Sequence, residues 1–153
     1  MATIRERLDA DLKEAMRSKD ELKLSVIRMA KSAIKYKEVE GTNKVLDEPG
    51  IVNVLTTMLK QRRDSVAEFQ KAGRAELVEK EEKEIAIILQ YLPQQLSAAE
   101  LTAEIASAIA EAKATGPKDM GNVMKIVTPR LKGKAEGKLI SEEVKAQLSK
   151  LGG

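Results

Sequence analysis

The apolar residues of this 153-residue chain recur at three- and four-residue steps along almost its whole length. Residues at these steps lie on one face of an α-helix, so each run predicts an amphipathic helix that buries one side. Met16 belongs to the first run and Met29 to the second. A polar Ser-Lys-Asp segment separates these two runs, and glycines or prolines separate the later ones. The expected helices run from Thr3 to Met16, from about Leu22 to Gly41, from about Pro49 to Ala72, from Arg74 to about Leu92, from Ser97 to about Ala114, from about Lys118 to about Leu131, and through Ile140 to Leu151. The sequence therefore predicts an all-α fold.

Two of these helices begin with recognisable capping residues. Asp47 closes an expected loop over residues 41–50 and is a suitable N-cap, because Pro49 is tolerated in the first turn that follows. Ser97 and Glu100 form the S-x-x-E pattern of a capping box. Both signals predict where a helix starts.

The Leu92-Pro93 step marks the predicted domain boundary. Proline disfavours the helical conformation of the residue before it and has no N–H to donate. Four expected helices precede this step and three follow it. We therefore expect a four-helix N-terminal domain over residues 1–93 and a smaller three-helix C-terminal domain over residues 94–153. With 42% hydrophobic residues, the chain can bury a core in each part.

The composition excludes most catalytic chemistry. The chain has no Cys and no His, which removes disulfides, thiolate nucleophiles, the usual zinc sites and imidazole acid–base catalysis. Tyr36, Phe69 and Tyr91 are its only aromatic residues, too few to stack the bases of single-stranded nucleic acid. We predict no catalytic residue, no metal site and no cofactor.

Arg62 projects into the middle of the apolar stripe of the third expected helix. If the third and fourth helices fold back antiparallel around Gly73, Glu84 lies as far after the turn as Arg62 lies before it, and Glu81 lies one turn closer. A buried charge is tolerated when it is paired and strongly destabilising when it is alone. We therefore predict a structural ion pair from Arg62 to Glu84 or Glu81. The alternative is that Arg62 and its basic neighbours bind an anion.

Residues 116–138 concentrate positive charge. They carry six basic and two acidic side chains, a net charge of +4, whereas the rest of the chain carries 21 basic and 22 acidic residues, a net charge of −1. On the expected helix, Lys118, Lys125 and Lys132 recur every seven residues opposite the apolar side and form a straight basic ridge. Pro129 predicts a kink or an early end of this helix, and a flexible Lys-Gly-Lys loop is expected to follow it.

A surface of this kind suits sequence-independent contact with nucleic-acid phosphates. A glycine in the ridge also lets a ligand approach the backbone, at a cost of roughly 0.5–1 kcal/mol relative to alanine in a helix. The alternative is an ordinary solvated helix face. The predicted RNA-binding residues are Lys118, Gly121, Asn122, Lys125, Arg130, Lys132, Lys134 and Lys138.

Three stretches, Lys23 to Ile34, Met58 to Ser97 and Lys118 to Ile140, together resemble the YqeY family. The last third, with its D-M-G-x-V-M and P-x-L-K-G-K-A-x-G-K elements, is similar to the tail domain of the GatB subunit of tRNA-dependent amidotransferases. Those enzymes convert misacylated Glu-tRNA or Asp-tRNA to the Gln or Asn form. Glu136 departs from the family pattern, which commonly has Asp there. The resemblance implies an all-helical protein in two parts.

The resemblance also implies a stand-alone module, tRNA-binding and related to the amidotransferases. By association with GatB, the family carries the label of carbon–nitrogen ligase activity with glutamine as amido-N-donor. The GatB domain that performs the ATP-dependent chemistry is absent from this chain. We therefore do not expect the chain to catalyse the reaction alone. Expected partners are tRNA and a protein of the translation or aminoacylation machinery. The alternative is a non-catalytic adaptor that docks an acidic protein and has no RNA role.

The amino-terminal residues alternate charge with leucine and contain no apolar segment, so we expect neither a secretory signal nor a membrane anchor. A cytoplasmic protein is the resulting expectation. The oligomeric state is left open by the sequence.

Overall fold

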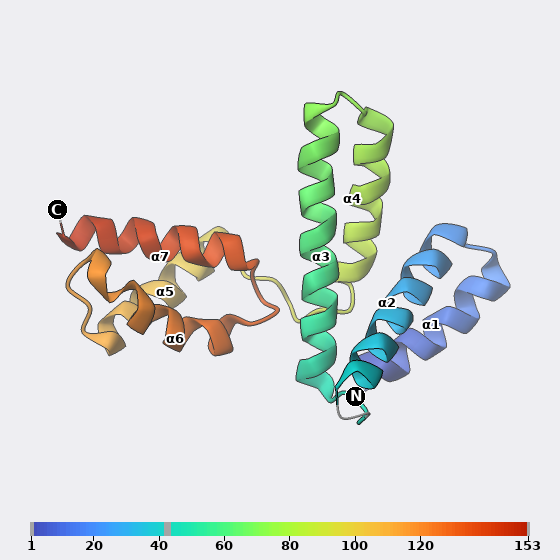
Figure 1. Cartoon of the computed structure of the whole chain (residues 1–153), viewed down its shortest axis with the longest axis horizontal. Coiled ribbons are helices and arrows are strands. Elements are labelled where there is room, and N and C mark those ends of the chain that lie inside the picture. The colour runs from blue at the N-terminus through green and yellow to red at the C-terminus, as the bar shows by residue number, and fades with distance from the viewer. Residues whose placement is uncertain (1, 42–43, 153) are drawn as a thin grey trace. The chain divides into compact units, whose positions relative to one another are not determined.

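The computed structural model describes residues 2–41 and 44–152, and within these residues it contains seven α-helices, one 3-10 helix and no strand (Figure 1). The elements are α1 (Ile4–Ser18), α2 (Glu21–Glu40), α3 (Glu48–Lys71), α4 (Ala75–Leu89), α5 (Ala98–Ala112), η1 (Pro117–Asp119), α6 (Met120–Leu131) and α7 (Gly137–Gly152). The all-α prediction is confirmed. Of the expected loop at 41–50, residues 42 and 43 lie outside the described residues, and α3 already begins at Glu48.

The chain divides into two compact units, Met1–Leu92 and Pro93–Gly153. The first unit contains α1 to α4, and the second contains α5, η1, α6 and α7. Each unit has its own apolar core, and no buried residue belongs to both cores. We therefore describe each unit by itself.

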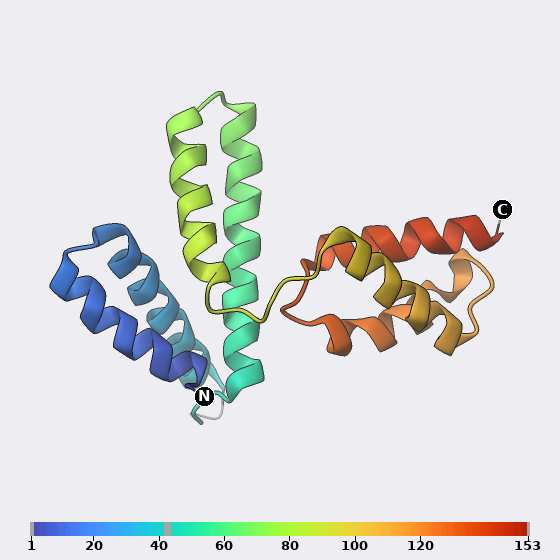
Figure 2. The same ribbon diagram turned by 180° about the vertical axis from the view of Figure 1, so that it is seen from behind.

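The first unit consists of two helical hairpins, α1 with α2 and α3 with α4 (Figures 1 and 2). The α1–α2 turn passes through Lys19 in the left-handed conformation, at φ 60°, and the α3–α4 turn passes through Gly73 at φ 69°. The two hairpins share one core, because α2 packs against both α3 and α4. Its most deeply buried large side chains include Leu8, Ile27, Ile51, Leu55 and Ile88.

Polar side chains cap the helices of this unit. Asp47 accepts a hydrogen bond from the Gly50 backbone N–H at 2.9 Å, which confirms the predicted N-cap of α3. Thr3 and Glu6 form a capping box at the start of α1 that the sequence analysis did not identify. These bonds satisfy backbone donors that the first turn of a helix leaves without a partner.

Met16 and Met29 were predicted to be buried and are exposed. Met16 has an exposed fraction of 53% whereas Ala15 beside it has 1%, and Met29 has 39% whereas Ile27 has 0%. The apolar stripes on α1 and α2 are wider than the surface that their neighbours cover. The packing direction of the neighbouring helices selects which edge of each stripe is buried, and the helical period alone does not give that direction.

The second unit encloses a separate core between α5, α6 and α7, around residues such as Ile105, Val123 and Leu148. The predicted capping box of Ser97 and Glu100 is confirmed at the start of α5. Pro129 lies inside α6, and the helix continues past it to Leu131. The helix therefore does not end at this proline.

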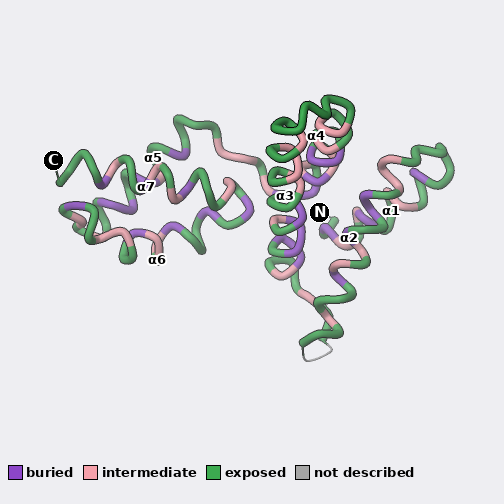
Figure 3. The backbone as a smooth tube through the Cα atoms, turned by 45° about the horizontal axis from the view of Figure 1, so that its top comes forward, coloured by how far each residue is buried: buried purple, intermediate pink, exposed green. Residues whose placement is uncertain are grey.

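The end of α7 packs closely on the turn before η1. A Cβ atom added at Gly152 would lie 2.7 Å from Cδ of Pro117, and one added at Gly116 would lie 3.6 Å from Cα of Gly152. Real Cβ contacts do not become as short as the first distance, so the packing here requires the glycine at position 152. Figure 3 shows that burial follows the facing sides of the helices, while the turn of the α3–α4 hairpin is largely exposed.

Candidate functional site

The candidate site is the lysine surface of the second unit, which we define as Lys118, Lys125, Lys132, Lys134 and Lys138. All five side chains are exposed. Lys118 lies in η1, Lys125 in the middle of α6, and Lys138 in the first turn of α7. Lys132 and Lys134 lie in the connection between α6 and α7. The surface is thus distributed over several elements.

This distribution corrects the predicted straight ridge. The helix was expected to open near Lys118, but α6 begins at Met120 after the 3-10 turn, and it ends at Leu131. Lys132 itself has extended backbone angles, φ −56° and ψ 125°. Seven-residue steps define a straight line only within one continuous helix. Of the three lysines in the predicted ridge, only Lys125 lies within α6.

The turn from Lys132 to Lys134 is held by the segment that leads into α5. The Leu96 backbone N–H donates to the Lys134 carbonyl oxygen at 2.8 Å, and Nε2 of Gln95 donates to the Gly133 carbonyl oxygen at 2.6 Å. Gly133 is buried and adopts φ 78°, a conformation that favours glycine. The expectation of a freely flexible loop is therefore wrong at this turn.

Gln95 is a contributor that sequence reasoning missed. Its side-chain amide also donates to the Pro93 carbonyl oxygen at 2.9 Å, so one half-buried group joins two turns. Gln95 and Gly133 are 38 positions apart in the chain. No local pattern signals such a bond, since it depends on how α5 and α6 pack.

The charged neighbours of the lysine surface are paired. Arg130 binds Glu111 through two hydrogen bonds of 2.6 and 3.0 Å, and this contact holds the pKa of the Glu111 carboxyl below its ordinary value. Asp119 accepts a hydrogen bond from the Thr115 backbone N–H at 2.8 Å, which lowers the pKa of Asp119. Arg130 is thus already engaged within the chain.

The lysines themselves are not paired in this way. Across residues 2–41 and 44–152, the observed salt bridges use other cations, although the charge of Lys118 also acts on the neighbouring Asp119 carboxylate. Their charge is available to an external anion. A polyanion that touched several of them would gain from each contact by releasing counterions.

Gly121 and Asn122 lie exposed in the first turn of α6, next to this surface. A Cβ atom added at Gly121 would meet nothing within 4 Å, and its backbone needs no positive φ. The fold of the chain therefore gives no steric reason for a glycine there. Close approach of an external group to the helix backbone is a physical reason that remains.

Arg62 and Glu84 form an ion pair inside the α3–α4 hairpin. Arg62 Nε lies 3.3 Å from Glu84 Oε1, and the two side chains have exposed fractions of only 11% and 7%. Arg62 also donates to the Met58 carbonyl oxygen at 3.3 Å. Glu81, the other predicted partner, is half-buried on the same helix and does not make this contact. A third hydrogen bond of Arg62 runs from Nη2 to Sδ of the exposed Met29 at 3.5 Å. The Arg62 guanidinium is thus engaged by groups of the first unit.

Comparison with known proteins gives a family match and several relatives. The family model described as YqeY-like protein matches residues 5–148. The chain is 37% identical to altered inheritance of mitochondria protein 41, mitochondrial, of Kluyveromyces lactis, over 91% of this chain and 72% of that protein. It is 42% identical to the proteins of the same name in Lachancea thermotolerans and Saccharomyces cerevisiae, over 72% and 61% of this chain.

The chain spans 60% of the length of the Lachancea protein and 51% of that of the Saccharomyces protein. All three relatives are named as mitochondrial, and this finding overturns the expectation of a cytoplasmic protein. Cellular compartments are set by address signals that receptors read, so charge and hydropathy along a folded chain do not identify them. Among the described residues, no helix has the length and apolar character needed to span a bilayer.

Proposed function

The chain belongs to the YqeY family, and on that premise we propose that it is a tRNA-binding module that grips the phosphates of folded RNA through the lysine surface. Its two units act as separate domains, four helices over residues 1–93 and three over residues 94–153. The second holds the RNA. This role extends the resemblance of the last third of the chain to the GatB tail domain.

The observation that carries the proposal is the set of five exposed lysines on one small unit, none of them in an observed salt bridge among the described residues. Phosphate contacts position a protein on nucleic acid without reading its sequence. The scarcity of aromatic residues supports the same mode, since recognition of unpaired bases depends on stacking. Gly121 and Asn122 add a place where a phosphate can reach the backbone and an amide.

The module is proposed to hold RNA for chemistry performed by another protein. The described residues contain no group of three or more acidic side chains placed to bind a metal ion, and the chain has neither Cys nor His. We therefore propose that the module contributes to glutamine-dependent amidotransfer, a carbon–nitrogen ligase reaction, by associating with a protein of the aminoacylation machinery. Glutamine-dependent conversion of Glu-tRNA by the purified chain alone would contradict this division of labour.

The test replaces Lys118, Lys125 and Lys132 together by alanine and titrates the full chain with tRNA at several salt concentrations. For about three phosphate contacts, the logarithm of the wild-type binding constant should fall with the logarithm of salt with a slope of about −3. The triple variant should bind at least about tenfold more weakly and lose most of this slope.

A matched control removes three lysines outside the surface, with Lys13, Lys145 and Lys150 changed to alanine. All three are exposed, so the variant has the same net charge as the test variant. The proposal is contradicted if both variants bind tRNA alike, or if the test variant keeps the wild-type affinity and slope. A partner that copurifies through these lysines after nuclease treatment would favour an acidic protein instead.

A further inference from the structure

A second surface lies on α2, in the first unit. Ser25, Met29, Ser32, Tyr36 and Val39 are all exposed and uncharged, and they fall within an arc of about 80° on the helix at 100° per residue. We call these five residues the α2 stripe. Met29, Tyr36 and Val39 have exposed fractions of 39%, 71% and 58%. Apolar residues scattered singly on a surface are ordinary, but here three of them are aligned.

The spacing of the α2 stripe is that of a helix seam. Met29 and Tyr36 are seven residues apart, as are Ser25, Ser32 and Val39, which reproduces the a and d positions of a heptad. Such a seam accepts the side chains of a second helix between its own. The small serines also leave room for large partner side chains. Tyrosine is enriched among residues that dominate binding energy at interfaces.

One flank of the α2 stripe is basic. Arg28 and Lys35 occupy positions next to the seam, and both are exposed. Within the described part of the chain, neither cation takes part in an observed salt bridge, although the charge of Lys35 also acts on Glu38. Two such cations beside an apolar seam favour a ligand that is apolar along its centre and acidic along one edge.

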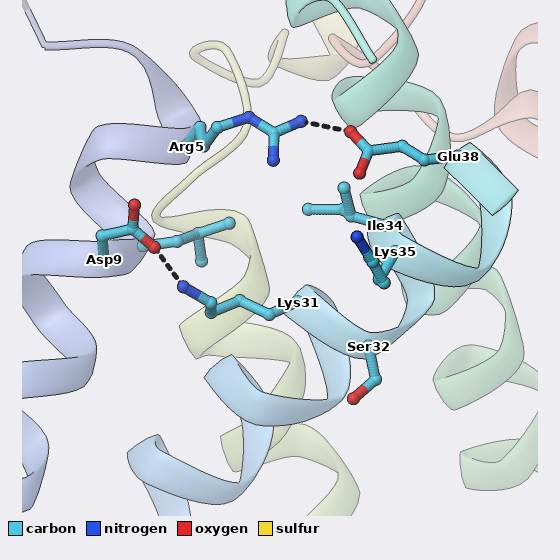
Figure 4. A pocket seen from close by; sticks show the side chains of 8 residues that line it. Arg5, Asp9, Lys31, Ser32, Ile34, Lys35 and Glu38 are labelled. Carbon is cyan, nitrogen blue, oxygen red and sulfur yellow. Dashed lines mark hydrogen bonds and ion pairs between the residues drawn. The ribbon is translucent and has the colours of Figure 1, made fainter. Parts of the chain in front are cut away.

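The same flank opens into a pocket between α1 and α2 of about 450 Å³ (Figure 4). Its apolar lining is Leu8 and Ile34, and Ser32 and Lys35 line it too, so the pocket continues the α2 stripe. Three cationic and two anionic side chains line it, a net positive set: Arg5, Lys31, Lys35, Asp9 and Glu38. The volume is large enough for one or two side chains of a partner.

Two ion pairs leave Lys35 as the available charge in this pocket. Arg5 binds Glu38 at 2.7 Å, and Lys31 binds Asp9. Hydrogen bonds from the Leu46 backbone N–H and from Arg5 hold the pKa of Glu38 below its ordinary value, so this carboxylate is charged at neutral pH. Figure 4 marks the Arg5–Glu38 and Lys31–Asp9 contacts with dashed lines and shows Lys35 beside them, where its charge also acts on Glu38.

We propose that this face of α2 docks an amphipathic helix of another protein, whose apolar stripe packs on Met29, Tyr36 and Val39 and whose acidic edge meets Arg28 and Lys35. A carboxylate of that edge enters the pocket and binds Lys35. A second copy of this chain fits less well, because an antiparallel α2 pair centred on Ser32 would bring Arg28 against Lys35. Nucleic acid fits less well because the seam is apolar.

The test uses a designed helical peptide as the probe, because the charges beside the α2 stripe indicate that the ligand is an amphipathic helix with an acidic edge. The α2 stripe is about 21 Å long at 1.5 Å per residue, so a lactam-stapled helical peptide of about 18 residues covers it. One peptide carries leucine at a and d positions and glutamate on one flank, and a second carries lysine on that flank. Fluorescence anisotropy with the full chain should show binding of the acidic peptide and at least about tenfold weaker binding of the basic one.

Variants on the exposed face locate the contact without disturbing the core. Tyr36→Ser with Val39→Ser should weaken acidic-peptide binding at least about tenfold. Arg28→Glu with Lys35→Glu should reverse the preference toward the basic peptide. The control variant Met16→Ser with Lys13→Glu removes a comparable exposed methionine and lysine from α1 and should bind like the wild type.

Three outcomes would overturn the proposal: equal binding of both peptides, acidic-peptide binding that survives the α2 variants, and self-association that those variants abolish. The last result, from sedimentation of the wild type and variants, would identify a second copy as the occupant. Titration with tRNA should be unchanged in the Tyr36→Ser, Val39→Ser variant, so the result is independent of the lysine surface.

Discussion

Arg62 is the charge whose loss should most destabilise the first unit. Removing one partner of a buried ion pair leaves the other charge without compensation and costs about 3–5 kcal/mol. Arg62→Met should therefore lower the free energy of unfolding by an amount of this order, because it strands Glu84, whose side chain is only 7% exposed. Urea denaturation followed by circular dichroism measures the change. The double variant Arg62→Met, Glu84→Leu should recover most of the loss, and equal losses in the single and double variants would contradict this account.

Asp119 should make stability depend on pH. Its pKa is lowered, first by the hydrogen bond from the Thr115 backbone N–H, so its stabilising contribution is complete above the ordinary carboxyl value of 3.8 and is lost as the pH falls through the lowered value. Asp119→Asn should therefore lower the melting temperature at pH 7 and have little effect near the lowered pKa. Thermal melts at several pH values test this, with the exposed Glu142→Gln as a control expected to change little. A penalty that stays the same down to acid pH would contradict it.

At this scale, the sequence identifies contacts whose partners are related by simple local geometry. Arg62 and Glu84 lie at equal distances on either side of Gly73, so an antiparallel hairpin opposes them. Tyr91 is different, because its hydroxyl donates to Asp11, 80 positions away. Gln95 is a similar case. Such long-range bonds depend on how helices pack, and no spacing along the chain reveals them.

At the scale of the helix, α6 carries a glycine, Gly121, at an exposed position where glycine lowers helix stability. Gly121→Ala should stabilise the second unit by roughly 0.5–1 kcal/mol, because alanine costs less backbone entropy and its Cβ meets nothing within 4 Å. The same change should weaken tRNA binding if a phosphate approaches the helix backbone there. Gly73→Ala is the contrasting control and should destabilise by about 1–2 kcal/mol, since Gly73 has φ 69°. Unchanged tRNA affinity in Gly121→Ala would remove Gly121 from the site.

The existence of each helix could be predicted because stripes and caps are local signals, as Asp47 and the Ser97–Glu100 pair show. The start of α6 could not be placed. The helix was expected to begin near Lys118, but a 3-10 turn precedes α6, and the Asp119 carboxylate accepts a hydrogen bond from the Thr115 backbone N–H and makes no cap bond to α6. Because the helix starts later, the five lysines are exposed but do not form the predicted straight ridge.

At the scale of the molecule, separate cores predict separate folding. Each unit buries its own apolar residues, so each should keep its structure without the other. Fragments of residues 1–93 and 94–153 should both give helical circular dichroism spectra and cooperative melts. The Tyr91–Asp11 hydrogen bond stays within the first fragment and the Gln95–Gly133 hydrogen bond stays within the second, whereas the division removes the bond from Gln95 to the Pro93 carbonyl oxygen.

The same fragments also separate the two proposed binding surfaces. Residues 94–153 contain all five lysines of the lysine surface and should retain tRNA binding with a salt slope of about −3. Residues 1–93 contain the α2 stripe and should retain the acidic peptide alone. Equimolar mixing of the fragments should leave both affinities unchanged, because the surfaces lie on different units. If tRNA binding instead follows residues 1–93, or requires the intact chain, the lysine surface is insufficient and the RNA contact must include residues of the first unit.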